Sequence, residues 1–96
     1  MIALVATIRV NEGKAELFEE VFRAVAAVVA AEEPGCRFYQ LAKSRTEANT
    51  YKVLELYQDQ AALDVHAKSD AARAAFGKMA GCMAGRPEVE HLDAVV

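Results

Sequence analysis

The stretch YKVLELYQDQAALDVH, residues 51–66, predicts a strand that passes directly into a helix. Apolar and polar side chains alternate through its first half, and this period of two is typical of a strand, here over 50–58. Asp59 follows, and its short acidic side chain is a favourable N-cap for a helix that runs through Ala67. The rest of the chain is organised around this strand-to-helix unit.

Similar patterns predict the other elements. Proline disfavours helical geometry in the residue before it, so the Glu-Pro-Gly turn at 33–35 ends a long first helix whose cap lies near Asn11 or Glu12. Ser69 is a second favourable N-cap and opens a separate helix. Alternation and helical spacing predict strands over 2–10, 36–43 and 88–96, helices over 14–32 and 70–81, and a polar turn over 44–49.

The order of these elements is βαββαβ, with the second helix broken at Ser69, and it predicts an α+β fold. This is the ferredoxin-like arrangement, an antiparallel sheet with two helices on one face, within a single domain over 1–96. Both faces of the strand over 2–10 are partly apolar. The face without helices is therefore expected to be covered by the sheet of a second copy in a homodimer.

The composition limits the class of protein. The chain has 96 residues, of which 54% are hydrophobic, and a formal net charge of -3. It contains no run of Lys or Arg, so nucleic acid is not an expected partner. No apolar run approaches the ~20 residues of a membrane span, so no membrane association is expected. The apolar start lacks a basic leader, and Cys36 and Cys82 are too few for a disulfide framework, so a cytoplasmic location is expected.

Two motifs, taken together, resemble one protein family. The first is EPGCRFY at 33–39, and the second is E-x-Y-x-D-x-x-A-L-x-x-H within 51–66. A helix that opens at Ser69 and carries Phe76 follows them. In this order the features resemble the antibiotic biosynthesis monooxygenase family over nearly the whole chain. The resemblance implies a dimeric α+β barrel of two ferredoxin-like subunits. It also implies oxidation of small aromatic substrates, such as quinols and polyketide phenols, by O2 without metal, flavin or haem.

Some positions depart from the pattern of that family. Tyr57 stands where many members carry tryptophan, and Ala71 stands where many carry a second histidine. The haem-degrading relatives use an asparagine on the first strand and a tryptophan on the third, where this chain has Thr7 and Tyr57, so haem is not expected. Relatives that isomerise a phosphorylated signalling sugar in autoinducer-2 breakdown share the layout of Glu55, Tyr57 and a following histidine.

His66 and Glu55 are the candidate catalytic residues. Histidine can exchange a proton near neutral pH, so His66 is a candidate general base; the alternative is a histidine packed between helix and sheet. Glu55 lies among apolar neighbours, where a buried carboxylate without a partner would be costly. It would orient the base or bind a substrate hydroxyl, or else pair with Lys52, Lys43 or Arg37 across the hairpin.

Four aromatic residues are the candidate substrate-binding residues: Tyr39, Tyr51, Tyr57 and Phe76. Their rings can stack on an aromatic substrate, and the tyrosines can present a hydroxyl to it. The alternative for each is to fill the core or an interface. His91, on the last predicted strand, is expected to have a structural or interfacial role.

Neither a metal nor a cofactor is expected. The two histidines and the two cysteines are far apart and show no ligand spacing, and no glycine-rich phosphate loop joins a strand to a helix. Cys36 has no base near it in the sequence, so it is expected to be a small buried side chain. Alternation over 36–43 places it on the face opposite Tyr39.

The resemblance and these residues together lead to three candidate functions. The first is a cofactor-independent monooxygenase whose partners are a small quinol or polyhydroxy-aromatic and O2, with His66 as base. The second is an isomerase of a small hydroxyketone or its phosphate, which would use His66 and Glu55 and turn over without oxygen. The third is a dimeric ligand-binding module without chemistry of its own.

Overall fold

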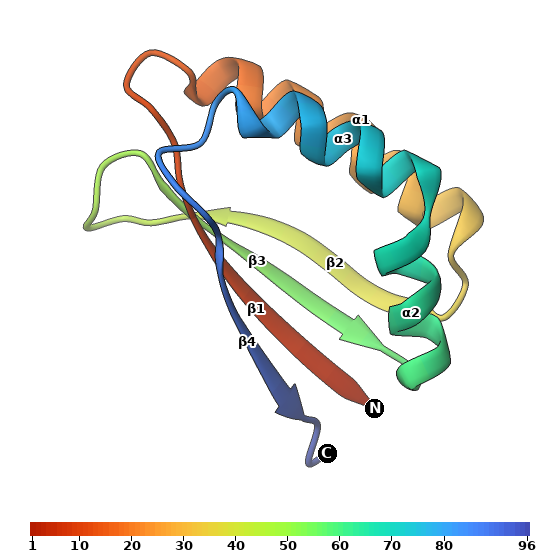
Figure 1. Cartoon of the computed structure of the whole chain (residues 1–96). Helices are drawn as coiled ribbons and strands as arrows, with labels where there is room; N and C mark the ends of the chain where they lie inside the picture. Colours follow the sequence, from red (N-terminus) through yellow and green to blue (C-terminus); the bar gives the residue numbers. More distant parts are fainter.

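A sheet on one side and three helices on the other make up the computed structural model of this protein, which describes residues 1–96 (Figure 1). The elements are β1 (Ile2–Arg9), α1 (Ala15–Glu32), β2 (Cys36–Lys43), β3 (Thr50–Tyr57), α2 (Gln60–Lys68), α3 (Asp70–Ala80) and β4 (Glu88–Asp93). The four strands are antiparallel and stand in the order β2-β3-β1-β4. The predicted α+β, ferredoxin-like arrangement is confirmed, with the second helix divided at Ser69.

Side-chain caps fix where α2 and α3 begin. Asp59 Oδ1 accepts a hydrogen bond from the amide of Ala62 at 2.9 Å, and Ser69 Oγ accepts one from the amide of Ala72 at 3.0 Å. Each bond satisfies an amide that has no partner within its own helix. Both predicted N-caps are therefore confirmed.

The start of α1 differs from the prediction. The N-cap is Lys14, whose side chain makes no capping hydrogen bond. Asn11 lies in the preceding turn, where its carbonyl accepts a hydrogen bond from the Lys14 amide and its side-chain amide donates to the carbonyl of Met83. The expectation of a cap near Asn11 or Glu12 was wrong, because Asn11 ties this turn to the loop between α3 and β4 instead.

The hydrophobic core lies between the sheet and the helices α1 and α3. Phe18, Phe22, Val25 and Val29 line the buried side of α1 at helical spacing. The ring of Tyr51 packs on Phe18, with 4.9 Å between centroids. Twelve buried residues form the core cluster: Ala6, Ile8, Val10, Phe18, Phe22, Val25, Val29, Tyr51, Val53, Ala75, Met79 and Cys82.

The second face of the sheet carries no helix (Figure 1). Large apolar side chains are exposed there, with Phe38 at 51%, Leu54 at 36% and Leu92 at 41% of full exposure. The register pairs Leu54 with Val5, and directly paired residues share a face, so Val5 belongs to the same surface. This face is partly apolar, as the sequence predicted.

A β-bulge changes the alternation of β2. The register shifts between Cys36 and Phe38, so that Cys36 pairs with Tyr57 and Tyr39 pairs with Glu55. Cys36 and Tyr39 therefore both face the helices. The prediction that they lie on opposite faces was wrong, because the extra residue of a bulge reverses the alternation on one side of it.

The first and last strands are shorter than predicted. β1 ends at Arg9, and Val10 forms an isolated bridge to Met83. β4 ends at Asp93, whereas the prediction extended it to Val96. None of the helices combines the length and the apolar character needed to cross a membrane.

Candidate active site

The beginning of β2 and the end of β3 lie side by side, with α2 above them (Figure 1). The approach is close at Gly35, since a Cβ atom there would lie 2.5 Å from the Cβ of Ala62. Carbon atoms in contact normally stay about 3.5–4.0 Å apart, so only glycine fits without displacing α2. The Glu-Pro-Gly turn thus sets how near the helix that carries His66 comes to the sheet.

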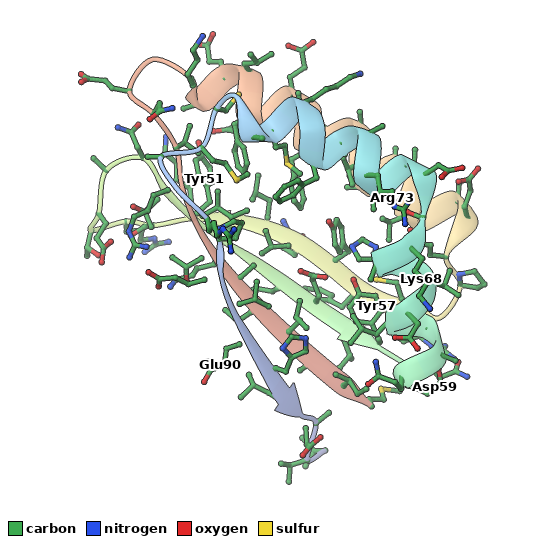
Figure 2. The ribbon with its side chains drawn as sticks, in the orientation of Figure 1. Tyr51, Tyr57, Asp59, Lys68, Arg73 and Glu90 are labelled. Carbon is green, nitrogen blue, oxygen red and sulfur yellow. The ribbon has the colours of Figure 1, made fainter.

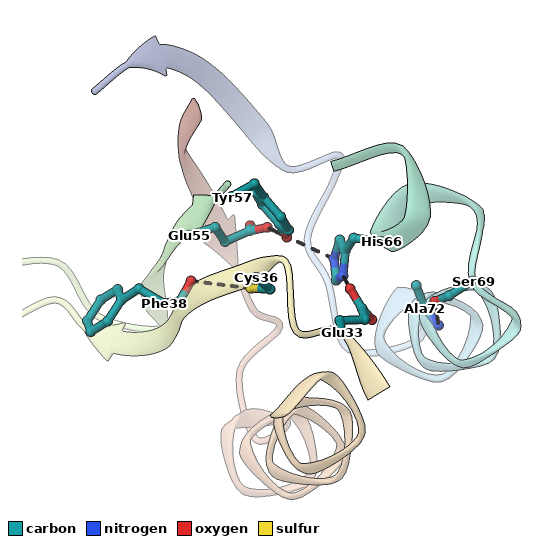
Figure 3. Close-up of polar contacts among 8 residues, drawn as sticks. All are labelled: Glu33, Cys36, Phe38, Glu55, Tyr57, His66, Ser69 and Ala72. Atoms are coloured by element: carbon teal, nitrogen blue, oxygen red, sulfur yellow. Dashed lines mark hydrogen bonds and ion pairs between the residues drawn. The ribbon is translucent and has the colours of Figure 1, made fainter. Parts of the chain in front are cut away.

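His66 lies above this junction, and Figure 3 shows its ring between Glu33 on one side and the pair of Glu55 and Tyr57 on the other. Its ring centroid is 5.5 Å from that of Tyr57 and 5.4 Å from that of Tyr39. The Tyr57 hydroxyl donates a hydrogen bond to Glu55 Oε1 at 2.5 Å. The structure therefore brings together four of the predicted site residues, His66, Glu55, Tyr57 and Tyr39.

Glu33 is a site residue that the sequence did not reveal. Its Oε1 lies 2.9 Å from His66 Nδ1, and its side chain is only 6% exposed. In the sequence this residue served only to mark the end of the first helix. Its position in the sequence was nevertheless informative, because the turn that ends the helix also leads into β2, beside the strand that carries Glu55.

The other ring nitrogen of His66 has no hydrogen-bond partner in the protein. Nε2 is 4.0 Å from Glu55 Oε1, which is beyond hydrogen-bonding distance. No buried side-chain nitrogen or oxygen lacks a partner, so Nε2 must be accessible to solvent. His66 thus combines one anchored nitrogen with one accessible nitrogen, which is the arrangement that a general base requires.

Burial dominates the proton affinities around His66. It raises the pKa of Glu55, while the hydrogen bond from Tyr57 and the charge that His66 can carry oppose that increase. Burial, together with the bond to Glu55, raises the pKa of Tyr57 well above its ordinary range, and burial does the same for the pKa of Tyr39. Both hydroxyls remain protonated at neutral pH. They can donate hydrogen bonds but cannot act as bases.

Cys36 adjoins this cluster without joining its chemistry. The thiol is half-buried and lies within reach of the carbonyl of Phe38, with 3.5 Å between sulfur and oxygen. Burial raises its pKa, and the nearby carboxylates of Glu33 and Glu55 act in the same direction. A protonated thiol is a weak nucleophile. Cys36 was expected to be buried, but the structure leaves it half-buried.

A pocket of about 380 Å³ opens beside His66. Tyr39 and Phe76 give it aromatic surface, and Phe76 is half exposed at its edge. Its charged group is Arg73, which forms no ion pair. The lining residues are Val25, Tyr39, His66, Ala67, Ala72, Arg73, Ala75, Phe76 and Met79.

Tyr51 is not part of this site. Figure 2 shows Tyr51 and Tyr57 at opposite ends of the sheet, and six residues of a strand span about 20 Å. Tyr51 is 1% exposed, its hydroxyl donates to Glu19, and Lys43 lies over its face. Burial, followed by the bond to Glu19, raises the pKa of Tyr51 to about 12. The prediction placed it with Tyr57 because the two share a face, but the separation along the strand keeps them apart.

The alternative for Glu55, an ion pair with a cation across the hairpin, is absent. Lys52 lies on the opposite face of the sheet and donates a hydrogen bond to Thr7. Arg37 donates to the side-chain oxygen of Gln58. Lys43 lies over the ring of Tyr51, at the other end of β3. The polar partners of Glu55 are Tyr57 and, across 4.0 Å, His66.

His91 is exposed on β4, opposite Leu4, which in turn pairs with Glu55. Its charge is near enough to oppose the increase in the pKa of Glu55. Nowhere in the structure do three or more His, Cys, Asp or Glu side chains form a group that could hold a metal ion.

Comparison with known proteins points to one family. The profile of a family described as antibiotic biosynthesis monooxygenase matches residues 1–78. A provisionally assigned antibiotic biosynthesis monooxygenase from Caulobacter crescentus CB15 is 50% identical, over 99% of this chain and 90% of that chain, with a TM-score of 0.97. Comparison with curated proteins gives no match.

More distant structures share the fold. A provisionally assigned antibiotic biosynthesis monooxygenase from Nitrosomonas europaea is 18% identical, covers 100% of both chains and gives a TM-score of 0.90. A conserved protein from Methanosarcina mazei Go1 is 23% identical, over 95% of this chain and 89% of that chain, with a TM-score of 0.88.

Proposed function

The chain belongs to the antibiotic biosynthesis monooxygenase family, and from this premise we propose that it oxidises a small quinol or polyhydroxy-aromatic with O2, without a bound cofactor. The observation that supports the proposal is the state of His66. Its Nδ1 is anchored on a buried carboxylate, its Nε2 is accessible and unpartnered, and it lines a pocket with aromatic walls.

The reaction begins with a proton transfer. His66 accepts a proton from a phenolic hydroxyl of the substrate, and the resulting phenolate is electron-rich enough to reduce O2 itself. One oxygen atom of O2 forms a bond to a ring carbon, and the other leaves as water together with two hydrogen atoms from the substrate. A hydroquinone thus becomes a hydroxyquinone. The ring supplies every electron that O2 takes up, so atoms and electrons balance without another reductant.

The neighbouring residues support this step. The imidazolium formed on His66 lies between Glu33 and Glu55, whose carboxyl groups favour a positive charge between them. Tyr57 holds Glu55 in place through its hydrogen bond. Tyr39 and Phe76 contact the substrate ring in the pocket, where exclusion of water strengthens these interactions.

The test is oxygen uptake by metal-free protein with a panel of hydroquinones, with 18O2 as the oxidant. We expect uptake above the non-enzymatic rate and one labelled oxygen atom in the product. His66→Gln should lose at least 90% of the activity, whereas Asp64→Asn, an exposed change on the same helix, should retain it. Unlabelled product, or equal activity in His66→Gln, would refute the proposal.

The two alternative functions give different results in the same experiment. An isomerase would convert a hydroxyketone or its phosphate without oxygen. A ligand-binding module would retain a quinol unchanged.

Assembly as a sheet-to-sheet homodimer is part of the proposal. It is supported by the exposed apolar side chains of the open face, which include Phe38 and Leu54. Burying such side chains stabilises an interface by about 25 cal/mol per Å². Leu54→Asp should therefore give a monomer in light scattering, and Leu17→Asp, a change at an exposed leucine of α1, should leave the dimer intact. A dimeric Leu54→Asp variant would place the interface elsewhere.

A further inference from the structure

We propose that Glu33 is a positioning residue that holds His66 with Nδ1 protonated and Nε2 free to accept the substrate proton. The proposal deepens the function proposed above and rests on it for the identity of the substrate. It gives a role to the turn at 33–35 beyond ending α1.

The donor and acceptor roles follow from the geometry. A carboxylate can only accept hydrogen bonds, so a contact of 2.9 Å between Glu33 Oε1 and His66 Nδ1 requires the hydrogen on Nδ1. In the neutral ring Nε2 then has a lone pair and no proton. This nitrogen is also the accessible one. Without Glu33 the two neutral tautomers would compete, and in one of them Nε2 could not act as a base.

The position of Glu33 is unfavourable for stability alone. It is the C-cap of α1, where the helix dipole disfavours a negative charge. The last turn of α1 contains no basic residue, and the ion pair that Glu33 forms is with His66. The contact with His66 therefore offsets the cost of burying an acid at the negative end of a helix. A locally unfavourable placement of this kind is typical of functional sites.

The charge of the ring depends on every group that faces it. After His66 accepts a proton, Glu33 pairs with the imidazolium through Nδ1, and Glu55 lies 4.0 Å from Nε2. The titratable and charged groups near the ring are Glu33 at the end of α1, Cys36 and Tyr39 on β2, Glu55 and Tyr57 on β3, Arg73 on α3, and His91 across Leu4 on β4.

The first measurement does not need activity. Nitrogen chemical shifts of the His66 ring, assigned with the help of His91→Gln, report its tautomer in the folded protein. We expect the Nδ1–H tautomer in the wild type. In Glu33→Gln the preference for the Nδ1–H tautomer should weaken, because a neutral amide holds that hydrogen less strongly than a carboxylate does. Glu32→Gln removes the same charge from the exposed neighbouring residue and should leave the tautomer unchanged.

The second measurement is kinetic. Glu33→Gln should lower kcat for the best hydroquinone about 10- to 100-fold, with KM within about threefold of the wild type. Glu33→Asp should recover part of the loss, and Glu32→Gln should behave as the wild type.

An Nε2–H tautomer in the wild type, or equal tautomer populations in Glu33→Gln and Glu32→Gln, would overturn the proposal. If Glu33→Gln fails to fold, the wild-type tautomer still decides the question. If no hydroquinone is oxidised, the proposed function fails, and the spectra still test the contact between Glu33 and His66.

Discussion

Gly35→Ala tests whether the turn before β2 sets the height of α2 above the sheet. The added Cβ would lie 2.5 Å from the Cβ and 3.5 Å from the Cα of Ala62. Ordinary carbon contacts need about 3.5–4.0 Å, so the two segments must separate by about 1 Å or more. Both contacting atoms are close to backbone, so no flexible side chain can move aside.

The energetic cost follows from this overlap. Forcing a methyl group into a packed contact costs about 1–3 kcal/mol, and each kcal/mol lowers the Tm of a domain of this size by about 4–8 °C. His66 lies four residues after Ala62, so the two lie on the same side of α2. A shift of the helix by about 1 Å would lengthen the 2.9 Å contact between His66 and Glu33 beyond hydrogen-bonding distance.

Urea denaturation at one protein concentration measures the stability loss, and oxygen uptake measures the effect on the site. Gly77→Ala is the matched control, because a Cβ at Gly77 meets nothing within 4 Å and the residue lies inside α3. It should stabilise the protein by about 0.5–1 kcal/mol and leave activity unchanged. The double change of Gly35→Ala with Ala62→Gly removes the overlap and should recover activity. It should retain a loss of about 1 kcal/mol, because glycine is a poor helix former.

The outcome that contradicts this reasoning is specific. If Gly35→Ala has the stability of the wild type, or if Ala62→Gly fails to rescue it, the contact between the turn and α2 does not fix the position of the helix.

Three further predictions concern separate parts of the structure. Burial raises the pKa of Glu55 above 4.5, so the folded state keeps the proton of this carboxyl to higher pH than the unfolded chain does. The stability that comes from this tighter proton binding is present at low pH and is lost as pH rises through the pKa of the folded state. Glu55→Gln should therefore match the wild type in urea denaturation below pH 4.5 and become relatively more stable above it; a difference independent of pH would contradict this. Arg73 is the unpaired charge of the pocket, so Arg73→Gln should raise KM about tenfold for a hydroquinone that carries a carboxylate. KM for hydroquinone itself should stay within about twofold of the wild-type value, and Arg86→Gln is the control. Tyr51→Phe removes the hydrogen bond to Glu19 and should cost about 1 kcal/mol in the free energy of unfolding without changing oxygen uptake.

The fold was predictable because its signals are local. Alternation fixed the strands, and the short polar side chains of Asp59 and Ser69 fixed the starts of α2 and α3. The errors occurred where a distant contact replaced a local one. Asn11 bonds to the loop at Met83 instead of capping α1, and the bulge before Phe38 turns Cys36 toward the helices. Neither the hydrogen bond of Asn11 nor the bulge can be recognised from a few neighbouring residues of the sequence.

The structure brings some of the predicted site residues together and separates others. The alternation over 50–58 puts Glu55 and Tyr57 on one face of the strand, and the structure shows that this face is turned toward the helices. The same alternation includes Tyr51, because sharing a face says nothing of distance along the strand. Glu33 was missed because its neighbour Pro34 explained the end of the helix. A physical signal existed, since a glutamate at the C-terminal end of a helix opposes the dipole and so requires a compensating partner.

The topology itself explains why the two motifs meet. β2 and β3 form an antiparallel hairpin, so the first residue of one lies opposite the last residue of the other, and Cys36 pairs with Tyr57. The turn before Cys36 and the helix after Tyr57 must then leave the sheet at the same end. Glu33 and His66 are each close to that end in sequence, and their 33-residue separation is closed by the hairpin. The contact between them is therefore a consequence of strand pairing, and any change that shifts the hairpin register by two residues should abolish it while leaving both faces of the sheet correct.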